Sequence, residues 1–396
     1  MIRRHGLFFL SCLLAFTAGH MFNYTVILYL QETVGSDLLS GLGFGLAFGS
    51  SIVFGWFAGV LCDRLAPVRV IHGAQAMFLL GLACLWWADS GGAAHRVAWT
   101  LTGAFAGGVA WSFVGPARLT TLGQIASPAE LRPATIVFNL QVLVGFGLAP
   151  LLIGIIRSHA GWGTVLAVAA SGFVLASLLI LGIRTHAHPH PSNQSVLADI
   201  AEGFRVVGSR LMLRQLMLAA VIGYAMTGPL QILLPKLARE VLGLSESQRG
   251  AYLGLLAISL ITGGVLALAL ARRVHHGRII FGGVVAGSLL FASLSQVRDA
   301  ALSAAMLGGV GILGGMVISL VVSGIQAHAP DAMRGRVMAM YSITSQVLPA
   351  LSGVVAGVLV NQLGVTTAIA VAGLALAGMA GIGAIAMPAL RRTAGH

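Results

Sequence analysis

Charge is scarce in this sequence. Only 9% of its 396 residues are charged, whereas soluble domains carry roughly 25%. Lysine occurs once, at Lys236. So few charges could not cover the surface of a water-soluble globule of this size, and a disordered chain would be polar and highly charged. Both classes are excluded, which leaves a polytopic membrane protein.

Cysteine and enzyme motifs are also scarce. The three cysteines, Cys12, Cys62 and Cys84, fall in or beside apolar runs and indicate no disulfide framework. The sequence has no Gly-x-Ser-x-Gly, no His-Glu-x-x-His and no Walker loop. We therefore expect neither an enzyme nor a cofactor, and any transport must be driven by a gradient. The basic balance of +12 is explained by loop arginines, so no nucleic acid is expected.

Long apolar segments dominate what is present. Apolar residues make up 57% of the chain, and a membrane span needs about 20 of them in a row. The first segment is too long for a signal peptide and is read as an uncleaved span. The sequence predicts an all-α membrane protein with twelve transmembrane helices, at 6–30, 40–62, 68–88, 97–116, 134–156, 163–183, 215–237, 249–271, 279–296, 300–325, 337–360 and 366–388.

The cations predict the orientation. With twelve spans, 17 of the 23 cationic residues fall on the side of the two termini, Arg118 among them. Cytoplasmic loops carry an excess of cations, so both termini are expected in the cytoplasm. The predicted location is the bacterial inner membrane, with the lipid bilayer as surroundings and no sign of oligomerisation, hence a monomer.

A polar central stretch divides the chain. Residues 185–214 begin with a proline-containing linker and continue with Leu197, Ile200, Phe204 and Val207 at helical spacing, which predicts an amphipathic helix at the cytoplasmic interface. On either side, Pro128-Ala-Glu-Leu-Arg132 is repeated as Pro330-Asp-Ala-Met-Arg334. Such duplication is typical of transporters. We expect six-helix bundles at 1–184 and 215–396.

These features resemble the major facilitator superfamily. Gly59-Val-Leu-Cys-Asp63-Arg64 matches the Gly-x-x-x-Asp-Arg opening of its loop motif, although the later glycine is Ala66 and of the paired basic residues only Arg69 remains. The resemblance implies two pseudo-symmetric six-helix bundles that work by alternating access. It also implies a cytoplasmic gate at the loop motif, for which we expect Gly59, Asp63, Arg64, Arg118 and Arg334.

A finer resemblance is to the enterobactin-exporter and macrolide-efflux branch of the drug:proton antiporters. It rests on Gly115-Pro116-Ala117-Arg118, on Glu202-Gly203-Phe204-Arg205 and on Ala329-Pro330 with the following Arg334-Gly335-Arg336-Val337. Gly145-x-Gly147-x-Ala149-Pro150-x-x-x-Gly154 is similar to the span-five pattern of the antiporters, and also suits a kinked, closely packed helix. The resemblance implies secondary active export by proton antiport.

The acids constrain the cargo. All eleven are expected in loops or at span ends, namely Glu32, Asp37, Asp63, Asp89, Glu130, Asp199, Glu202, Glu240, Glu246, Asp299 and Asp331. A desolvated cation needs an anionic partner, so a neutral or anionic small molecule is predicted. A siderophore-like metabolite is the preferred cargo. A macrolide-like hydrophobic antibiotic, a flipped lysolipid, or a sensor that has lost transport are the alternatives.

His20 is the leading candidate for cargo binding or proton coupling. An ionisable group at mid-span is costly, and the ordinary pKa of histidine, near 6.5, suits proton transfer. The alternative is a neutral histidine hydrogen-bonded between helices. Polar or aromatic residues at similar depth could line a cavity, with ordinary interhelical bonding as the alternative. These are Asn23, Tyr24, Trp111, Asn139, Gln141, Tyr224, Thr227, Gln231, Tyr341, Ser342, Ser345 and Gln346.

Two further groups of residues could form an outer gate and a metal site. Glu32 and Lys236, near the outer ends of spans one and seven, could close an outer gate by an ion pair, or they could extend separately to the lipid headgroups. His186, His188 and His190 alternate in the linker as metal ligands can, but linker composition explains them equally well and no metal is predicted.

Overall fold

The computed structural model is all-helical in the part of the chain that it describes, residues 2–186, 196–270, 276–330 and 333–392. Within those ranges, nothing is stated of the side chains at 2–4, 59–60, 63, 132, 196–200, 268–270, 276, 334–335 and 392. Among the described residues, eleven helical segments are long and apolar enough to cross a membrane, and Trp162–Leu178 is a shorter apolar helix at the sixth predicted span. The twelve predicted segments thus all fall on apolar helices.

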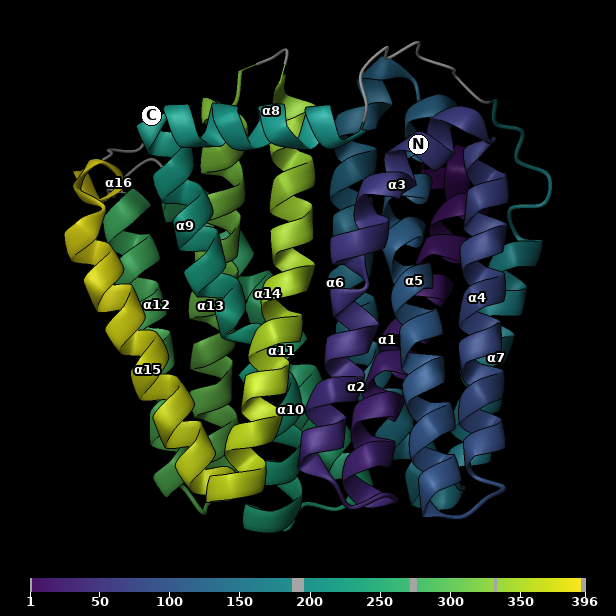
Figure 1. Ribbon diagram of the computed structural model, residues 1–396, viewed down its shortest axis with the longest axis vertical. Coiled ribbons are helices and arrows are strands. Elements are labelled where there is room, and N and C mark those ends of the chain that lie inside the picture. The colour runs from purple at the N-terminus through teal and green to yellow at the C-terminus, as the bar shows by residue number, and fades with distance from the viewer. Residues whose placement is uncertain (1, 187–195, 271–275, 331–332, 393–396) are drawn as a thin grey trace. The chain divides into compact units, whose positions relative to one another are not determined.

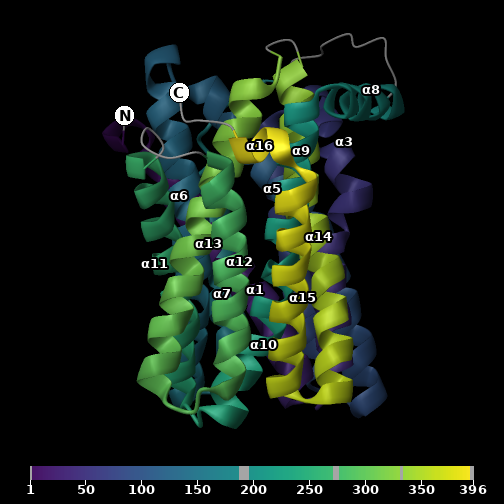
Figure 2. The same cartoon turned by 90° about the vertical axis from the view of Figure 1, so that its left-hand side faces the viewer.

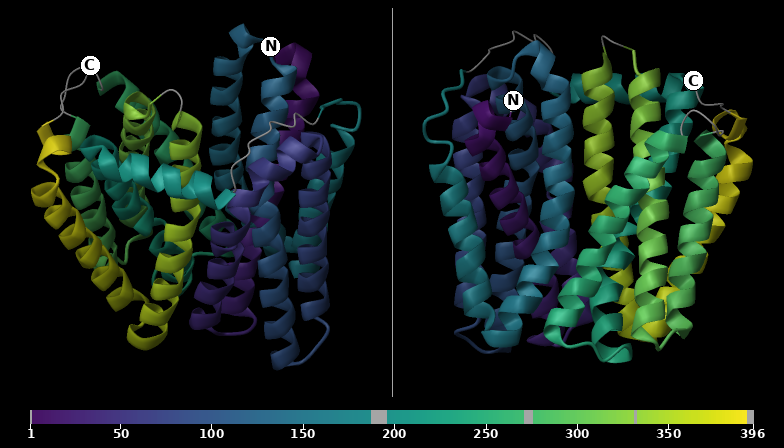
Figure 3. Two further views of the ribbon diagram at one scale, coloured as in Figure 1. Left: turned by 45° about the horizontal axis from the view of Figure 1, so that its top comes forward. Right: turned by 180° about the vertical axis from the view of Figure 1, so that it is seen from behind.

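The first compact unit comprises residues 1–191 together with 244–254. Its helices stand roughly side by side, and the chain begins at one end of the bundle (Figure 3). They are α1 (Ile2–Glu32), α2 (Asp37–Gly49), α3 (Ser51–Arg64), α4 (Pro67–Ala88), α5 (Ala93–Ile125), α6 (Pro128–His159) and α7 (Trp162–Leu178). The second predicted span is two helices, α2 and α3, that meet at Ser50.

The second unit comprises residues 192–243 together with 255–396. Within it α12 packs against both α13 and α15 (Figure 2). The elements are α8 (Val196–Ser209), α9 (Leu211–Ala225), α10 (Thr227–Lys236), the π-helical turn η1 (Leu237–Val241), α11 (Glu246–Leu270), α12 (His276–Ser293), the 3₁₀ turn η2 (Leu294–Gln296), α13 (Ala300–His328), α14 (Arg334–Leu363), α15 (Val365–Ala386) and α16 (Pro388–Arg392). The first residues of α11 belong to the first unit.

The predicted amphipathic helix corresponds to α8. It lies crosswise to the spanning helices of its unit, against α9 and α14 (Figure 1). Val207 is buried, whereas Phe204 is 60% exposed. Gly203 lies against the Met340 side chain, and Glu202 forms an ion pair with Arg336 of α14. The helix is therefore attached to α14 on one side and presents Phe204 outward.

Several helices extend well past their apolar stretches. The fourth predicted span ends at residue 116, but α5 continues through Pro116 to Ile125. Its last turns carry polar residues, which lowered the hydropathy on which the prediction depended. The assignment of Arg118 to a cytoplasmic loop is therefore wrong, because Arg118 lies inside α5 and is fully buried.

Candidate functional site

Three polar side chains form a stripe along the middle of α1. Thr17, His20 and Asn23 recur at intervals of three residues, which places them on one side of a helix. They are 9%, 6% and 3% exposed. Among the described residues, the Thr17 hydroxyl, both His20 ring nitrogens and both Asn23 amide atoms have no hydrogen-bond partner. Buried polar groups are normally hydrogen-bonded, so this stripe has unused hydrogen-bonding capacity in the described structure.

Aromatic rings surround His20. The indole of Trp111, on α5, meets the imidazole edge-to-face with the ring centroids 4.9 Å apart. Phe146, on α6, contacts the same imidazole at 5.3 Å and the Tyr24 ring at 5.9 Å. The Val142 carbonyl on α6 lies near the imidazole, but not in hydrogen-bonding geometry. The predicted residues His20, Tyr24 and Trp111 are thus brought together, and Phe146 is an addition that no sequence motif marked.

Glycines allow these helices to approach closely. A Cβ at Gly19 would lie 2.4 Å from the Trp111 ring, so only glycine leaves room for the indole against α1. A Cβ at Gly145 would lie 2.9 Å from the backbone of α1 at Phe16 and Thr17. Gly145 is the first glycine of the antiporter-like pattern. Its contact with α1 brings Phe146, the next residue along α6, beside the polar stripe.

The remaining predicted wall residues of the first unit differ in their surroundings. Gln141 donates from Nε2 to the Phe9 carbonyl of α1 at 2.8 Å, while its Oε1 is buried without a partner among the described residues. Asn139 is exposed on α6. Gln141 therefore connects α6 to α1 on the N-terminal side of the stripe, at Phe9. Asn139 does not join the cluster around His20.

In the second unit, predicted residues pair with each other. The hydroxyls of Tyr224, on α9, and Tyr341, on α14, are hydrogen-bonded, and their rings lie 5.7 Å apart. Ser345, one turn further along α14, lies near the Tyr224 hydroxyl and donates to the Ser342 carbonyl at 2.7 Å. Of the others, Gln231 on α10 is 6% exposed with an unpartnered Oε1 in the described structure, Ser342 is exposed, and Thr227 and Gln346 are half-buried.

The acidic side chains that the structure describes avoid the middle of the spans. Glu32 ends α1, Asp37 begins α2, Asp89 follows α4, and Glu246 begins α11. The others lie in the first turn of α6, in α8, in η1 and before α13, at Glu130, Glu202, Glu240 and Asp299. Asp63, Asp199 and Asp331 lie outside the described side chains. In the described structure, the polar stripe is thus surrounded by aromatic rings, and the acidic side chains lie away from it.

A cluster of four charges lies at the end of α1, within the first unit. Glu32 accepts from Arg157 of α6 at 3.1 Å and from Arg249 of α11 at 2.7 Å. Glu246 of α11 contacts the same two arginines. The Arg157 guanidinium also lies 4.0 Å above the Trp162 ring. The cluster is largely buried, with Glu32 and Arg249 13% and 12% exposed, so it fastens α11 to α1 and α6.

The predicted pair of Glu32 with Lys236 stays a prediction. Lys236 lies in the second unit, where it contacts Glu240 at 3.5 Å. Glu32 is the outer acid that the sequence selected, but its described partners come from α6 and α11. Arg157, Glu246 and Arg249 were not selected, because nothing in their spacing connects residues so far apart along the chain.

Glycines bring α6 and α11 into close contact next to the four-charge cluster. A Cβ at Gly154 would lie 2.5 Å from the Glu246 carbonyl oxygen, and one at Gly250 would lie 2.5 Å from the Pro150 carbonyl oxygen. A Cβ at Gly254 would lie 2.9 Å from the Gly147 carbonyl oxygen. The antiporter-like pattern of α6 therefore forms a backbone-to-backbone contact with the first turns of α11.

The cytoplasmic gate residues are only partly described. Arg64 is exposed at the end of α3. Gly59, Asp63 and Arg334 lie within helices, but outside the described side chains. His188 and His190 lie outside the described residues, while His186 exchanges two hydrogen bonds with Gln124 through its backbone. The proposed gating role of the loop motif stays a prediction.

Arg118 has surroundings that the sequence did not indicate. Its side chain is 0% exposed, and Nη1 donates to the Ser11 hydroxyl and to the Cys12 sulfur, both at 3.2 Å. Nε and Nη2 have no partner among the described residues. Arg118 and Trp111 are seven residues apart on one face of α5, and Cys12 and His20 are eight apart on one face of α1. Arg118 thus lies about two turns from the His20 cluster.

Two curated bacterial proteins are similar over most of this chain. The Sinorhizobium fredii protein named "Uncharacterized MFS-type transporter y4rN" is 26% identical over 377 residues, covering 90% of this chain and 89% of that protein. The Mycobacterium tuberculosis protein named "Multidrug efflux pump Tap" is 24% identical over 360 residues, covering 84% and 81%.

Solved transporter structures share the fold. A POT family transporter in complex with 5-aminolevulinic acid aligns with a TM-score of 0.79 at 12% identity, covering 98% of this chain and 97% of that one. The nucleoside transporter NupG aligns with a TM-score of 0.73 at 15% identity, covering 97% and 99%. These similarities confirm the predicted all-helical transporter fold.

The family assignment follows from the sequence itself. The model of the Major Facilitator Superfamily matches residues 8–353. The chain is therefore a multi-pass membrane transporter and not an enzyme, and it belongs to the Major Facilitator Superfamily.

Proposed function

We propose that this protein is a proton-coupled exporter of an uncharged or anionic hydrophobic small molecule, and that the cargo binds at the His20 cluster. The observation that carries the proposal is the stripe of Thr17, His20 and Asn23, whose buried polar atoms lack partners among the described residues beside a wall of aromatic rings. Hydrogen-bonding groups beside an apolar wall are the usual makeup of a small-molecule site.

The surroundings of the stripe favour a cargo without positive charge. A desolvated cation requires a nearby anion, and the acidic side chains described here lie at helix ends. Neutral donors and acceptors on Thr17, His20 and Asn23 suit hydroxyl, amide or carbonyl groups of a cargo. Trp111 and Phe146 suit its flat or apolar part.

The proposed direction of transport is export, and it is supported by the contact between α6 and α11 and by similarity to an efflux pump. The glycine contact between α6 and α11 uses the pattern that resembles the antiporters, and the buried cluster around Glu32 reinforces that contact. Similarity to a multidrug efflux pump supports export and favours a hydrophobic drug-like cargo over a siderophore. In this proposal the four-charge cluster separates when α11 moves away from α6.

His20 is the proposed proton carrier. The polar stripe contains no carboxylate in the described structure, and imidazole is the side chain that gains and loses a proton near neutral pH. Because the imidazole is buried, water or cargo must reach it before a proton is exchanged, which couples protonation to the conformational cycle. We further propose that both termini lie on the cytoplasmic side of a bacterial inner membrane, as the charge bias predicts.

The proposal is tested with purified protein in liposomes that carry an imposed proton gradient. The neutral dye N-phenyl-1-naphthylamine and the permanent cation ethidium serve as probes. We expect uphill movement of the neutral dye that a protonophore abolishes, and little movement of ethidium. Strong transport of ethidium without the neutral dye would overturn the cargo class, and binding of the dye without movement would support a sensor instead.

A further inference from the structure

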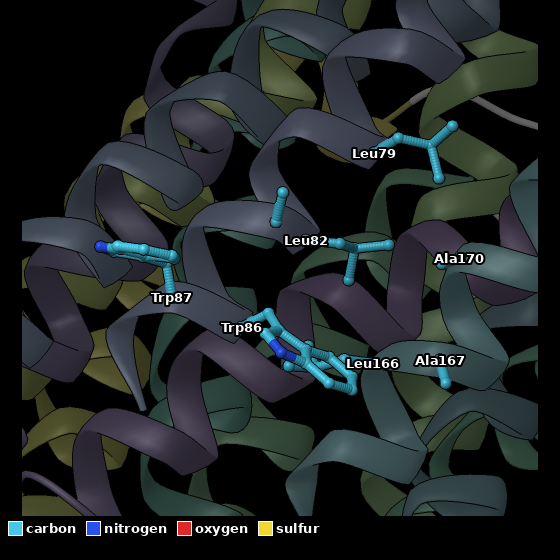
Figure 4. Close-up of a pocket in the computed structure, with 8 residues that line it drawn as sticks. Leu79, Leu82, Trp86, Trp87, Leu166, Ala167 and Ala170 are labelled. Atoms are coloured by element: carbon cyan, nitrogen blue, oxygen red, sulfur yellow. The ribbon is translucent and has the colours of Figure 1, made fainter. Parts of the chain in front are cut away.

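An apolar groove runs along the surface of the first unit between α4 and α7. It encloses about 420 Å³, which falls within the range of sites for small ligands, ~300–1,000 Å³. Figure 4 shows the Trp86 ring extending toward Leu166 and Ala167 of α7, with Leu82 beside it. The lining residues are Leu79, Leu82, Ala83, Trp86, Trp87, Leu166, Ala167 and Ala170. Apart from the indole nitrogens of Trp86 and Trp87, their side chains contain only carbon and hydrogen.

The shape of the groove follows from the residue sizes. Leu82 and Leu166 are buried and form its base, while the alanines leave space above them. Gly163 at the start of α7 lies under the Trp86 ring, where a Cβ would be 3.6 Å away. Trp86 and Trp87 are both 58% exposed. From Leu79 to Trp86 the groove extends about 10 Å along α4.

Polar groups follow in the chain beyond one end of the groove, in the first turn of α5. His95 contacts the Trp87 carbonyl oxygen through Nε2 at 3.0 Å, so the first turn of α5 lies beside the tryptophan pair. Arg96 follows, and its Nε is buried without a partner among the described residues. The nearby Asp89 carboxylate accepts from the Tyr29 hydroxyl at 2.9 Å. Tryptophan and arginine together at the end of a span are typical of the depth of lipid headgroups.

We propose that this groove is a phospholipid site, which holds one acyl chain against α4 and α7 and directs the lipid phosphate toward Arg96. An alkyl chain matches the apolar lining, and a guanidinium is a strong partner for phosphate. By the predicted orientation, the lipid belongs to the outer leaflet. A transmembrane helix of a partner protein fits less well, because such a helix would pack along a span of about 30 Å and not along two turns.

The groove can be filled without changing the rest of α4. Ala83→Phe places a ring in the groove, and Ala76→Phe is its matched control, since Ala76 is exposed on α4 seven residues earlier and is not part of the lining. Native mass spectrometry of protein extracted in mild detergent counts the phospholipids that stay bound. We expect one retained phospholipid in the wild type and in Ala76→Phe, and its loss in Ala83→Phe.

A second measurement keeps the proposal testable if Ala83→Phe does not fold. Phospholipid with a brominated acyl chain is titrated into nanodiscs that contain the wild type or the double variant Trp86→Phe, Trp87→Phe. We expect tryptophan quenching that saturates at a low fraction of brominated lipid in the wild type only, and weaker retention of anionic phospholipid in Arg96→Gln. Quenching proportional to the lipid fraction throughout, or equal lipid retention in all variants, would overturn the proposal.

Discussion

Buried polar side chains on α1 of the first unit and on α9 of the second unit differ in whether they have hydrogen-bond partners. On α1, Thr17, His20 and Asn23 are buried and unpartnered among the described residues. In the second unit, the Tyr224 hydroxyl of α9 is hydrogen-bonded to the Tyr341 hydroxyl of α14. Unsatisfied polar groups cost stability, whereas a satisfied pair contributes to it. In the proposed function, the stripe on α1 keeps its hydrogen-bonding capacity for a ligand, whereas the tyrosine pair holds α9 and α14 together.

The largest effect on transport is expected at His20, the middle residue of the unpartnered stripe on α1. His20→Gln retains a hydrogen-bonding side chain of similar size but cannot carry a proton at neutral pH. We expect uphill transport in liposomes to be abolished while dye binding stays within a few-fold of the wild type. His159→Gln is the control, because His159 is exposed at the end of α6. Wild-type accumulation by His20→Gln would remove His20 from proton coupling.

Arg118 sharpens the comparison, because it is another buried group of the first unit with unpartnered atoms. Arg118→Met keeps an unbranched chain and removes the charge, so we expect unfolding stability in detergent to be unchanged or raised. Arg118→Ala leaves a cavity and should lower stability by about 2–5 kcal/mol. Thermal unfolding of both variants checks this. Equal losses would show that the charge itself stabilises the fold.

The fold was predictable because membrane spans are set by apolar length. All twelve segments fall on apolar helices, since a lipid-spanning chain must satisfy its backbone internally. Helix ends were less predictable. The end of α5 carries Gln124 and two threonines after Arg118, and hydropathy alone cannot separate such an extension from a loop.

Contacts within the site were less predictable than its members. His20, Tyr24 and Trp111 could be selected one by one because polar and aromatic residues are conspicuous in apolar spans. Their partner Phe146 could not, because phenylalanine is unremarkable at that depth. The pairing of Glu32 with Arg157 and Arg249 depends on helix packing between segments more than a hundred residues apart, on which local periodicity carries no information.

The tyrosine pair tests the satisfied side of the comparison. Tyr224→Phe removes one hydroxyl and leaves the Tyr341 hydroxyl without that partner, so we expect stability to fall by about 1–2 kcal/mol. The double variant with Tyr341→Phe should lose less than the sum of the single variants, because neither hydroxyl is then left alone. Thermal unfolding of the three variants measures the coupling. Additive losses would contradict a shared hydrogen bond.

The smallest effect compares two threonines of α1. The Thr25 hydroxyl donates to the Met21 carbonyl at 2.7 Å, whereas the Thr17 hydroxyl has no partner among the described residues. Valine keeps the branched shape in both variants, so helix propensity is nearly unchanged. We expect Thr17→Val to raise stability by up to about 1 kcal/mol and to weaken dye binding, and Thr25→Val to change binding little. Thermal unfolding and dye titration separate the two. Equal responses at both positions would mean that the Thr17 hydroxyl is not reserved for a ligand, and the contrast between the two units would then rest on His20 and Asn23 alone.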